Sequence, residues 1–124
     1  LIFPDDLLEW HRSGLLDCRL AVKDPENSWG LPAVDISALF KDLELDPRRT
    51  IAAVSGPPET YRQINPLLFR MGLAEENVYL NLERHMKCGL GKCGKCQINN
   101  ITVCECGPIF PYSSIKHLHE AIER

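Results

Sequence analysis

The chain has 124 residues, of which 44% are hydrophobic and 25% are charged, the composition of an ordinary soluble globular protein. This length predicts one domain, or one domain with a small appendage. A formal net charge of −3 argues against nucleic acid and anionic membranes as partners. No apolar run approaches the roughly 20 residues that span a bilayer, and no signal peptide is recognisable. Because the chain begins at Leu1 rather than Met, we expect it to be a fragment of a longer protein.

The first third of the chain predicts a helix, a strand and a second helix. Residues 4–13 open with proline and two acidic residues, which suit the start of a helix, and Gly14 follows its end. Residues 16–22 are largely apolar and β-favouring, so we expect a strand there. A turn-rich loop over residues 24–32 leads to a helix over residues 35–43, whose apolar residues share one face.

Residues 50–54 form a short, almost wholly apolar run, as expected of a strand buried on both faces. The turn at residues 55–58 then leads into a helix that ends near Met71, and residues 78–82 predict a third strand. This alternation predicts an α/β fold with a partial Rossmann-like parallel sheet of about three strands. A doubly wound sheet usually has more strands and a Gly-rich phosphate loop after its first one, so we expect the first part of the sheet to lie outside the chain.

Beyond residue 83 the composition changes, because glycine and cysteine become frequent. We therefore divide the chain into an α/β part, residues 1–83, and a small cysteine-rich segment, residues 84–124. The dipeptide at residues 99–100 is Asn-Asn, which tolerates positive φ, and the apolar residues on either side of it predict a hairpin. A final helix over residues 113–122 closes the chain.

Four cysteines of the second part have the spacing C-x4-C-x2-C-x7-C. They are Cys88, Cys93, Cys96 and Cys104. The C-x4-C-x2-C start is the spacing that [2Fe–2S] clusters of the plant ferredoxin type use. Glycines between these thiols permit the positive φ angles that turn backbone N–H groups toward a cluster. The spacing therefore predicts a [2Fe–2S] cluster held by four thiolates.

Three other uses of the cysteines stay open. Structural zinc also takes four thiolates, but usually as two C-x2-C pairs, whereas this chain has one. A disulfide scaffold would spread its cysteines through the chain, and the gathered cysteines fit a metal site in a reducing cytoplasm better. The pair Cys93 and Cys96 has the spacing of a redox-active dithiol.

Cys106 adds a fifth thiol beside the predicted ligands. On an extended chain its side chain points the same way as that of Cys104, so either residue can be the fourth ligand. Cys18 lies in a predicted apolar strand, where a buried and unreactive thiol is expected.

Several stretches of the chain together resemble one known group of proteins. They are residues 83–96, 103–104, 107–110 and the Ser-Gly-Pro-Pro turn at residues 55–58. The group comprises the iron–sulfur flavoprotein subunits of the ferredoxin–NADP reductase-like superfamily. Its members include the gamma subunits of sulfhydrogenases, the B subunit of anaerobic sulfite reductase and the electron-transfer subunit of dihydroorotate dehydrogenase. The compact seven-residue gap before Cys104 favours the sulfhydrogenase or sulfite-reductase type.

The resemblance implies a flavin-binding β-barrel, then a nucleotide-binding α/β domain, then a C-terminal [2Fe–2S] segment. Residues 1–83 then correspond to the C-terminal half of the nucleotide-binding domain, and residues 84–124 to the cluster-binding segment. The FAD-binding region is expected to precede this chain, which is therefore not expected to be an active enzyme alone. In the intact protein, electrons would pass from NAD(P)H through FAD and the cluster to a catalytic partner subunit.

The resemblance also implies roles for individual residues. The implied cluster ligands are Cys88, Cys93, Cys96 and Cys104, the last of these because its neighbours match the group better than those of Cys106. Ser55, Gly56 and Pro57 are implied to lie beside the nicotinamide and flavin, with Ser55 in place of the usual cysteine. Lys23 and Asp24 stand where relatives touch the adenosine ribose, and an acid there favours NADH over NADPH.

Overall fold

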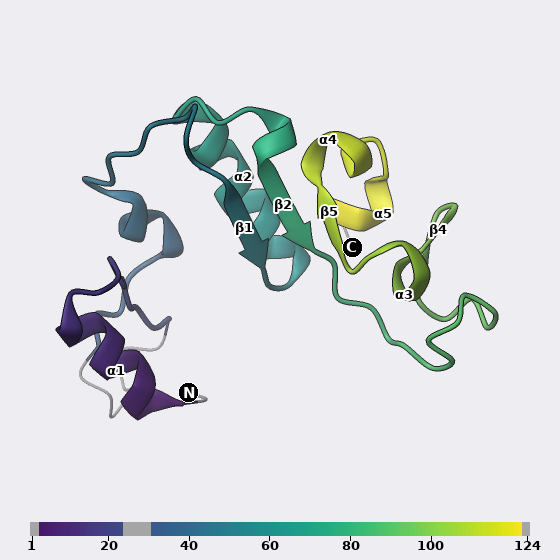
Figure 1. Cartoon of the computed structure of the whole chain (residues 1–124), viewed down its shortest axis with the longest axis horizontal. Helices are drawn as coiled ribbons and strands as arrows, with labels where there is room; N and C mark the ends of the chain where they lie inside the picture. The colour runs from purple at the N-terminus through teal and green to yellow at the C-terminus, as the bar shows by residue number, and fades with distance from the viewer. Residues whose placement is uncertain (1–2, 24–30, 123–124) are drawn as a thin grey trace. The chain divides into compact units, whose positions relative to one another are not determined.

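The computed structural model describes residues 3–23 and 31–122 (Figure 1). The chain forms two compact units, Leu1–Leu43 and Glu44–Arg124. The predicted division between residues 83 and 84 stays a prediction. In the described ranges, no helix has both the length and the apolar character needed to cross a bilayer.

The first unit begins with helix α1, Pro4–Ser13, at the predicted bounds. Asp5 and Asp6 lie in its first turn, where their negative charge stabilises the positive end of the helix dipole. Gly14 follows the last turn with φ +67°, a left-handed conformation that suits glycine and ends the helix. The prediction of this helix is confirmed, because the residues at its two ends favour its start and its stop.

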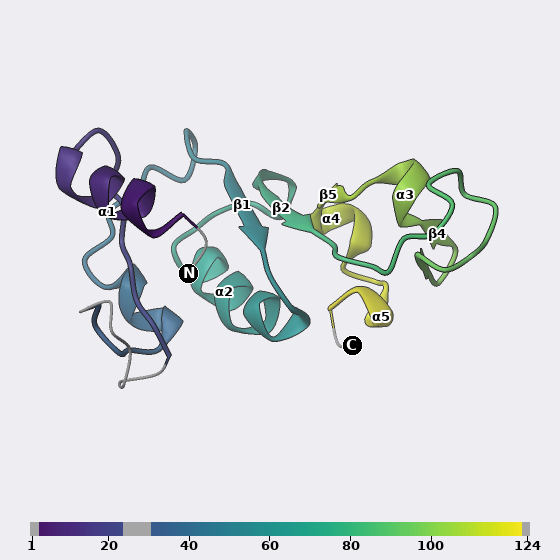
Figure 2. The same ribbon diagram turned by 90° about the horizontal axis from the view of Figure 1, so that it is seen from below.

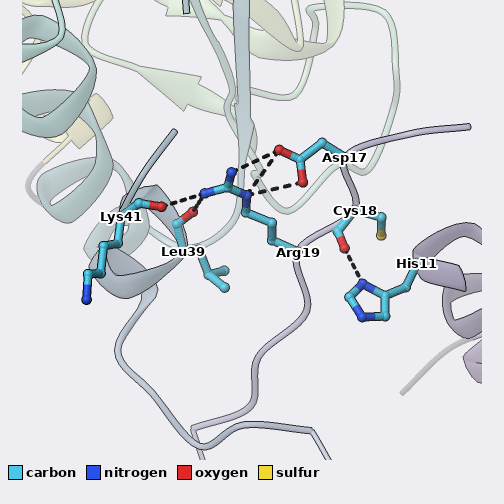
Figure 3. Close-up of polar contacts among 6 residues, drawn as sticks. All are labelled: His11, Asp17, Cys18, Arg19, Leu39 and Lys41. Atoms are coloured by element: carbon cyan, nitrogen blue, oxygen red, sulfur yellow. Dashed lines mark hydrogen bonds and ion pairs between the residues drawn. The ribbon is translucent and has the colours of Figure 1, made fainter. Parts of the chain in front are cut away.

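Arg19 joins two segments of the first unit through its guanidinium group (Figure 3). It donates hydrogen bonds to the carbonyl oxygens of Leu39 at 2.9 Å and Lys41 at 2.7 Å. It also pairs with the carboxylate of Asp17 at 3.0 Å. The segment after α1 is thus held to a later part of the unit by a side chain.

The strand predicted over residues 16–22 is wrong. Only Val22 makes a ladder contact, an isolated parallel bridge to Ala33. A β-strand needs a neighbouring strand that forms hydrogen bonds with its backbone N–H and C=O groups. Among the described residues, most of this segment has no such neighbour. One of its carbonyls, that of Cys18, accepts instead from Nδ1 of His11 at 2.5 Å.

The helix predicted over residues 35–43 is a shorter 3-10 helix, η1, Ile36–Phe40. Its N-cap is Asp35, whose carboxylate accepts from the N–H of Ser37 at 2.9 Å, and this bond lowers the pKa of the carboxyl group. No residue of η1 is buried, so the expected apolar face has little packing to extend the helix. Of the loop predicted before it, residues 24–30 lie outside the described ranges.

The second unit is built on a three-stranded sheet with the order β1-β2-β5. Its strands are Ala52–Ser55, Val78–Asn81 and Ile109–Pro111. β1 and β2 pair in parallel, as predicted, whereas β5 pairs with β2 antiparallel. The predicted α/β class is confirmed, but of the three strands in this sheet only β1 and β2 were predicted. The prediction of an all-parallel sheet is wrong, because its third strand comes from the cysteine-rich segment.

Helix α2, Pro58–Arg70, packs on one face of this sheet (Figure 2). The helix ends before Gly72, whose φ of +90° agrees with the predicted stop. A 3-10 turn, η2 (Glu75–Asn77), then leads into β2. The core lies between α2 and the sheet and includes Val54, Tyr61, Leu68, Val78, Leu80 and Phe110.

The other face of the sheet is open within the described part of the second unit. Ile51, just before β1, is 69% exposed, and Ile109 on β5 is 61% exposed. Val54 points to the opposite face and is buried. The prediction that residues 50–54 are buried on both faces is therefore wrong, because β1 is an edge strand covered on one face only.

The cysteine-rich segment contains the predicted hairpin. β3, Gln97–Ile98, and β4, Ile101–Thr102, pair antiparallel. Asn99 at the turn has φ +49°, a conformation that asparagine tolerates better than most residues. A single helical turn that the sequence did not predict, α3 (Val103–Cys106), follows directly.

The single helix predicted over residues 113–122 is wrong, since the chain forms two separate turns there. These are α4, Tyr112–Ile115, and α5, His119–Ile122. α4 packs against β2, β5 and η2, whereas α5 packs against α2. Because the two turns pack against different elements, the chain changes direction between Ile115 and Leu118. At this point the N–H of Leu118 donates to the carbonyl of Ile115 at 2.8 Å.

Residues 82–108 connect β2 to β5, and the two ends of this segment lie at neighbouring positions of the sheet. Asn81 at the end of β2 is opposite Ile109 at the start of β5. Just beyond them, the N–H of Leu82 donates to the carbonyl of Pro108 at 3.0 Å. Figures 1 and 2 both show the loop of this segment at the end of the second unit that lies away from β1 and α2.

Candidate metal centre

The four predicted ligand thiols all lie between β2 and β5, on different local structures. Cys88 and Cys93 are in the loop before the hairpin, Cys96 directly precedes β3, and Cys104 is in α3. Cys96 is only 2% exposed, whereas Cys93 is exposed. All six cysteines of the chain lie in the described ranges, and none of them is in a disulfide.

Backbone N–H groups point at three of these sulfurs. The N–H of Leu90 donates to Sγ of Cys88 at 3.4 Å. The N–H of Gly91 donates to Sγ of Cys104 at 3.3 Å, and the N–H of Cys104 donates to Sγ of Cys96 at 3.4 Å. The positive φ angles predicted for the loop glycines are present at Gly89, Gly91 and Gly94. The loop thus provides the inward N–H groups that stabilise thiolate sulfur.

Cys88 and Cys93 form a first pair of thiols. The pKa of the Cys88 thiol is lowered to about 6, because the N–H of Leu90 donates to its sulfur. The thiol and the N–H of Cys93 and the N–H of Lys92 contribute further hydrogen bonds. Near neutral pH, Cys88 is therefore largely in the thiolate form, which is the form that binds metals.

In the metal-free chain, Cys88 is expected to react with iodoacetamide faster than N-acetylcysteine does at pH 7. A lowered pKa means that the thiolate is already abundant at pH 7 and decreases only as the pH falls through about 6. Brief labelling at several pH values, followed by peptide mass spectrometry, measures this dependence. A labelling rate at Cys88 that rises only above about pH 8, as for an ordinary thiol, would contradict it.

Cys96 and Cys104 form a second pair. The N–H of Gly91 lowers the pKa of the Cys104 thiol, but the neighbouring Cys96 thiol and burial outweigh it, so the pKa is raised overall. Cys88 lies near enough to add to this rise. Among the described residues, no group of three or more His, Cys, Asp or Glu side chains is close enough together to hold a metal ion as the chain stands. The thiols are arranged as two neighbouring pairs.

This donor set fits a two-iron cluster. Each of the two irons in a [2Fe–2S] centre takes two protein ligands, and thiolate sulfur is the usual ligand type. Two adjacent thiol pairs therefore match the ligand requirement in both number and chemistry. The backbone N–H groups that reach the sulfurs match the hydrogen bonds that tune such clusters.

Cys106 does not share the direction of Cys104. The expectation of an extended chain is wrong, because both residues lie in α3, where residues two apart face different sides. Cys104 is half-buried and accepts from the N–H of Gly91, whereas Cys106 is exposed. The geometry therefore favours Cys104 as the fourth ligand.

The predicted nucleotide turn connects the end of β1 to the start of α2. A cleft of about 180 Å³ lies at this turn and is lined by Gly56 and Pro57 together with side chains from α2 and the segment after β2. Ser55 lines a different hollow, on the open face of the sheet. There its Oγ accepts from Nδ2 of Asn81 at 3.0 Å. The three residues are thus adjacent, but they do not share one cleft.

The structure does not test the two predicted ribose contacts. Lys23 lies in the first unit, at the edge of a described range. Asp24 lies outside the described residues. Their roles stay predictions.

Sequence reasoning missed two residues that link the turn and α2 to the end of β2. The hydroxyl of Tyr61 on α2 donates to the carbonyl of Asn81 at 2.5 Å, and the Asn81 side chain holds Ser55. Asn81 is the one polar residue in the run Val-Tyr-Leu-Asn-Leu apart from the tyrosine hydroxyl. Its position at the end of a strand was the available signal.

Residues 83–116 match a family model described as the iron–sulfur cluster binding domain of dihydroorotate dehydrogenase B. This stretch includes both thiol pairs, the hairpin, α3 and β5. No solved structure matches the chain.

Curated relatives match a larger part of the chain. Over 78 residues it is 40% identical to sulfhydrogenase 1 subunit gamma of Pyrococcus furiosus, which covers 60% of this chain and 27% of the relative. Over 98 residues it is 35% identical to the probable dihydroorotate dehydrogenase B (NAD(+)) electron transfer subunit of Archaeoglobus fulgidus, covering 78% of this chain and 41% of the relative. The chain therefore spans less than half the length of these relatives. The matches confirm the predicted resemblance: the chain is similar to part of an iron–sulfur flavoprotein subunit of the ferredoxin–NADP reductase-like superfamily, a group of electron-transport oxidoreductases.

Proposed function

We propose that the chain is the electron-transfer part of an NAD(P)H-linked flavoprotein oxidoreductase. In this proposal a [2Fe–2S] cluster is held by Cys88, Cys93, Cys96 and Cys104. The observation that carries it is the arrangement of these thiols as two pairs that receive backbone N–H groups. Structural zinc usually takes its four thiolates from two C-x2-C pairs, whereas this chain has one such pair preceded by C-x4.

When bound, a [2Fe–2S] cluster accepts and releases single electrons. The chain holds and tunes the centre. The N–H groups of Leu90, Gly91 and Cys104 direct positive charge at the ligand sulfurs, which stabilises the more negative, reduced state and raises the reduction potential. Cys96 is buried, whereas Cys93 is exposed, so the two thiol pairs would differ in their access to water.

The same proposal assigns nucleotide and flavin binding to the complete protein. Gly56 and Pro57 line a cleft at the carboxyl end of β1, the edge at which open α/β sheets bind their ligands. Ser55 would bond nearby, and Lys23 and Asp24 would contact the ribose of NADH. FAD would bind through a region that precedes this chain, and a catalytic subunit of hydrogenase, sulfite reductase or dihydroorotate dehydrogenase type would exchange electrons with the cluster in the cytoplasm.

Anaerobic purification of the chain, or reconstitution with ferrous iron and sulfide, tests the proposal. We expect a red-brown protein with about two iron and two sulfide ions per chain and an EPR signal after reduction with dithionite. Stoichiometric zinc without sulfide in that material would overturn the proposal and identify a zinc-stabilised module. A metal-free chain with a reversible disulfide between Cys93 and Cys96 would identify a dithiol oxidoreductase instead.

A further inference from the structure

The first half of the cysteine-rich segment, residues 84–104, differs in charge from the rest of the chain. Residues 84–104 contain four of the 14 basic residues and none of the 17 acidic ones, although the whole chain has a net charge of −3. The four are Arg84, Lys87, Lys92 and Lys95. Arg84 is half-buried and donates to the carbonyl of Glu120 at 2.5 Å, whereas the three lysines are exposed. The lysines therefore present positive charge to solvent around the thiols.

These three lysines carry charge that the chain itself does not neutralise. Elsewhere in the second unit, Lys116 pairs with Glu75 at 2.6 Å. Within the described ranges, the three lysines of the loop take part in no ion pair. The acids nearest in sequence are Glu83, four residues before Lys87, and Glu105 in α3, whose carboxylate lies beside Gly91.

Two exposed apolar side chains lie among the lysines. Met86 is 46% exposed and Leu90 is 68% exposed. Leu90 is flanked by Gly89 and Gly91, each with φ +67°, and its N–H donates to Sγ of Cys88. The backbone of Leu90 is thus fixed at a predicted ligand while its side chain faces solvent. Exposed apolar side chains combined with charged ones in one short stretch are typical of protein interfaces.

We propose that this surface, formed by Met86, Lys87, Leu90, Lys92 and Lys95, docks onto an acidic face of a partner redox protein. Leu90 and Met86 enter an apolar patch of the partner, and the lysines pair with carboxylates around it. The inference rests on the proposed function, since it names the chemistry of the partner at the same centre. The positive charge of the surface favours an acidic partner, because it attracts acidic proteins and repels basic ones.

Docking at this surface brings the partner to the thiol pairs. The loop lies at one end of the second unit in both views (Figures 1 and 2), and it includes the exposed Cys93. The step that follows is transfer of one electron from the reduced chain to the acceptor of the partner, with no bond made or broken. The partner's acceptor is reduced by the electron that the chain loses.

Two redox proteins of opposite charge serve as probes, namely plastocyanin, which is acidic, and mitochondrial cytochrome c, which is basic. The cluster-loaded chain is reduced anaerobically, freed of dithionite and mixed with each oxidised probe in a stopped-flow instrument at increasing NaCl. We expect the rate with plastocyanin to fall as salt rises and the rate with cytochrome c to be low and to rise. Fluorescence anisotropy of labelled plastocyanin measures binding separately and needs no iron in the chain.

Two double variants, at different positions in the second unit, each replace two basic residues by glutamate. Lys92→Glu with Lys95→Glu is expected to lower the rate and the affinity for plastocyanin about tenfold or more. Arg48→Glu with Arg49→Glu, two exposed positions before β1, is expected to change them by less than about threefold. Leu90→Ser is expected to weaken binding even at high salt, where the charge is screened. Visible spectra confirm that each variant keeps its cluster.

Three results would overturn the docking surface. The first is a rate of electron transfer to plastocyanin that does not depend on salt. The second is that both double variants lower this rate and the affinity equally. The third is concentration-dependent dimerisation of the chain that is abolished by Lys92→Glu with Lys95→Glu. The last result would assign the surface to a second copy of the chain. A wild-type chain that assembles no cluster would count against the proposed function instead, and the anisotropy measurement would still decide whether the surface binds an acidic protein.

Discussion

Serine at any one of the four paired thiols is expected to abolish assembly of the iron–sulfur cluster, whereas Cys106→Ser should leave it intact. Each iron needs two protein ligands, so the loss of one thiolate leaves one iron incompletely held. Cys96→Ser is the most severe case, because its sulfur is buried and accepts the N–H of Cys104. Iron and sulfide analysis with visible spectra, on chains reconstituted side by side, measures the effect.

Cys106→Ser is the matched control for these variants. It removes a thiol two residues from Cys104, but from an exposed position on another side of α3. A Cys104→Ser chain that keeps its full cluster, together with a Cys106→Ser chain that loses it, would reverse the assignment of the fourth ligand. Loss in both variants would show that Cys106 supports the cluster in a way that its exposed position does not explain.

Leu80→Ala is expected to lower the free energy of unfolding by about 3 kcal/mol. Leu80 is 0% exposed on the central strand β2, so its removal leaves a cavity in the core beside α2. In a urea titration followed by circular dichroism, this corresponds to a midpoint lower by roughly 1–3 M.

Ile51→Ala is the control for Leu80→Ala. Ile51 is 69% exposed beside the edge strand, so its truncation is expected to cost about 0.5 kcal/mol or less. Equal shifts for the two variants would mean that the open face of the sheet is covered in solution. That result would contradict the one-sided core described above.

Features whose determinants lie close together in sequence could be predicted. The hairpin at Asn99 and the helix after Pro58 depend on local conformational preferences, and both formed where they were expected. The parallel pairing of β1 and β2 followed from the strand–helix–strand order.

Features that depend on a distant partner could not be predicted. β5 ends at a proline and follows another at residue 108, so the sequence of this stretch did not predict a strand. The strand forms because it pairs with β2. Residues 16–22 had a strand pattern but found only a single bridge. The direction of Cys106 depended on whether residues 103–106 are extended or helical, a choice that four residues do not encode.

The neighbouring exit and entry points at Asn81 and Ile109 make residues 82–108 an insert in the sheet. An insert whose ends are already held together can unfold or be exchanged with little disturbance to the strands that carry it. The same geometry makes the segment a module that can be grafted onto another strand pair with matching ends, so that redox chemistry can be added to a sheet that lacks it.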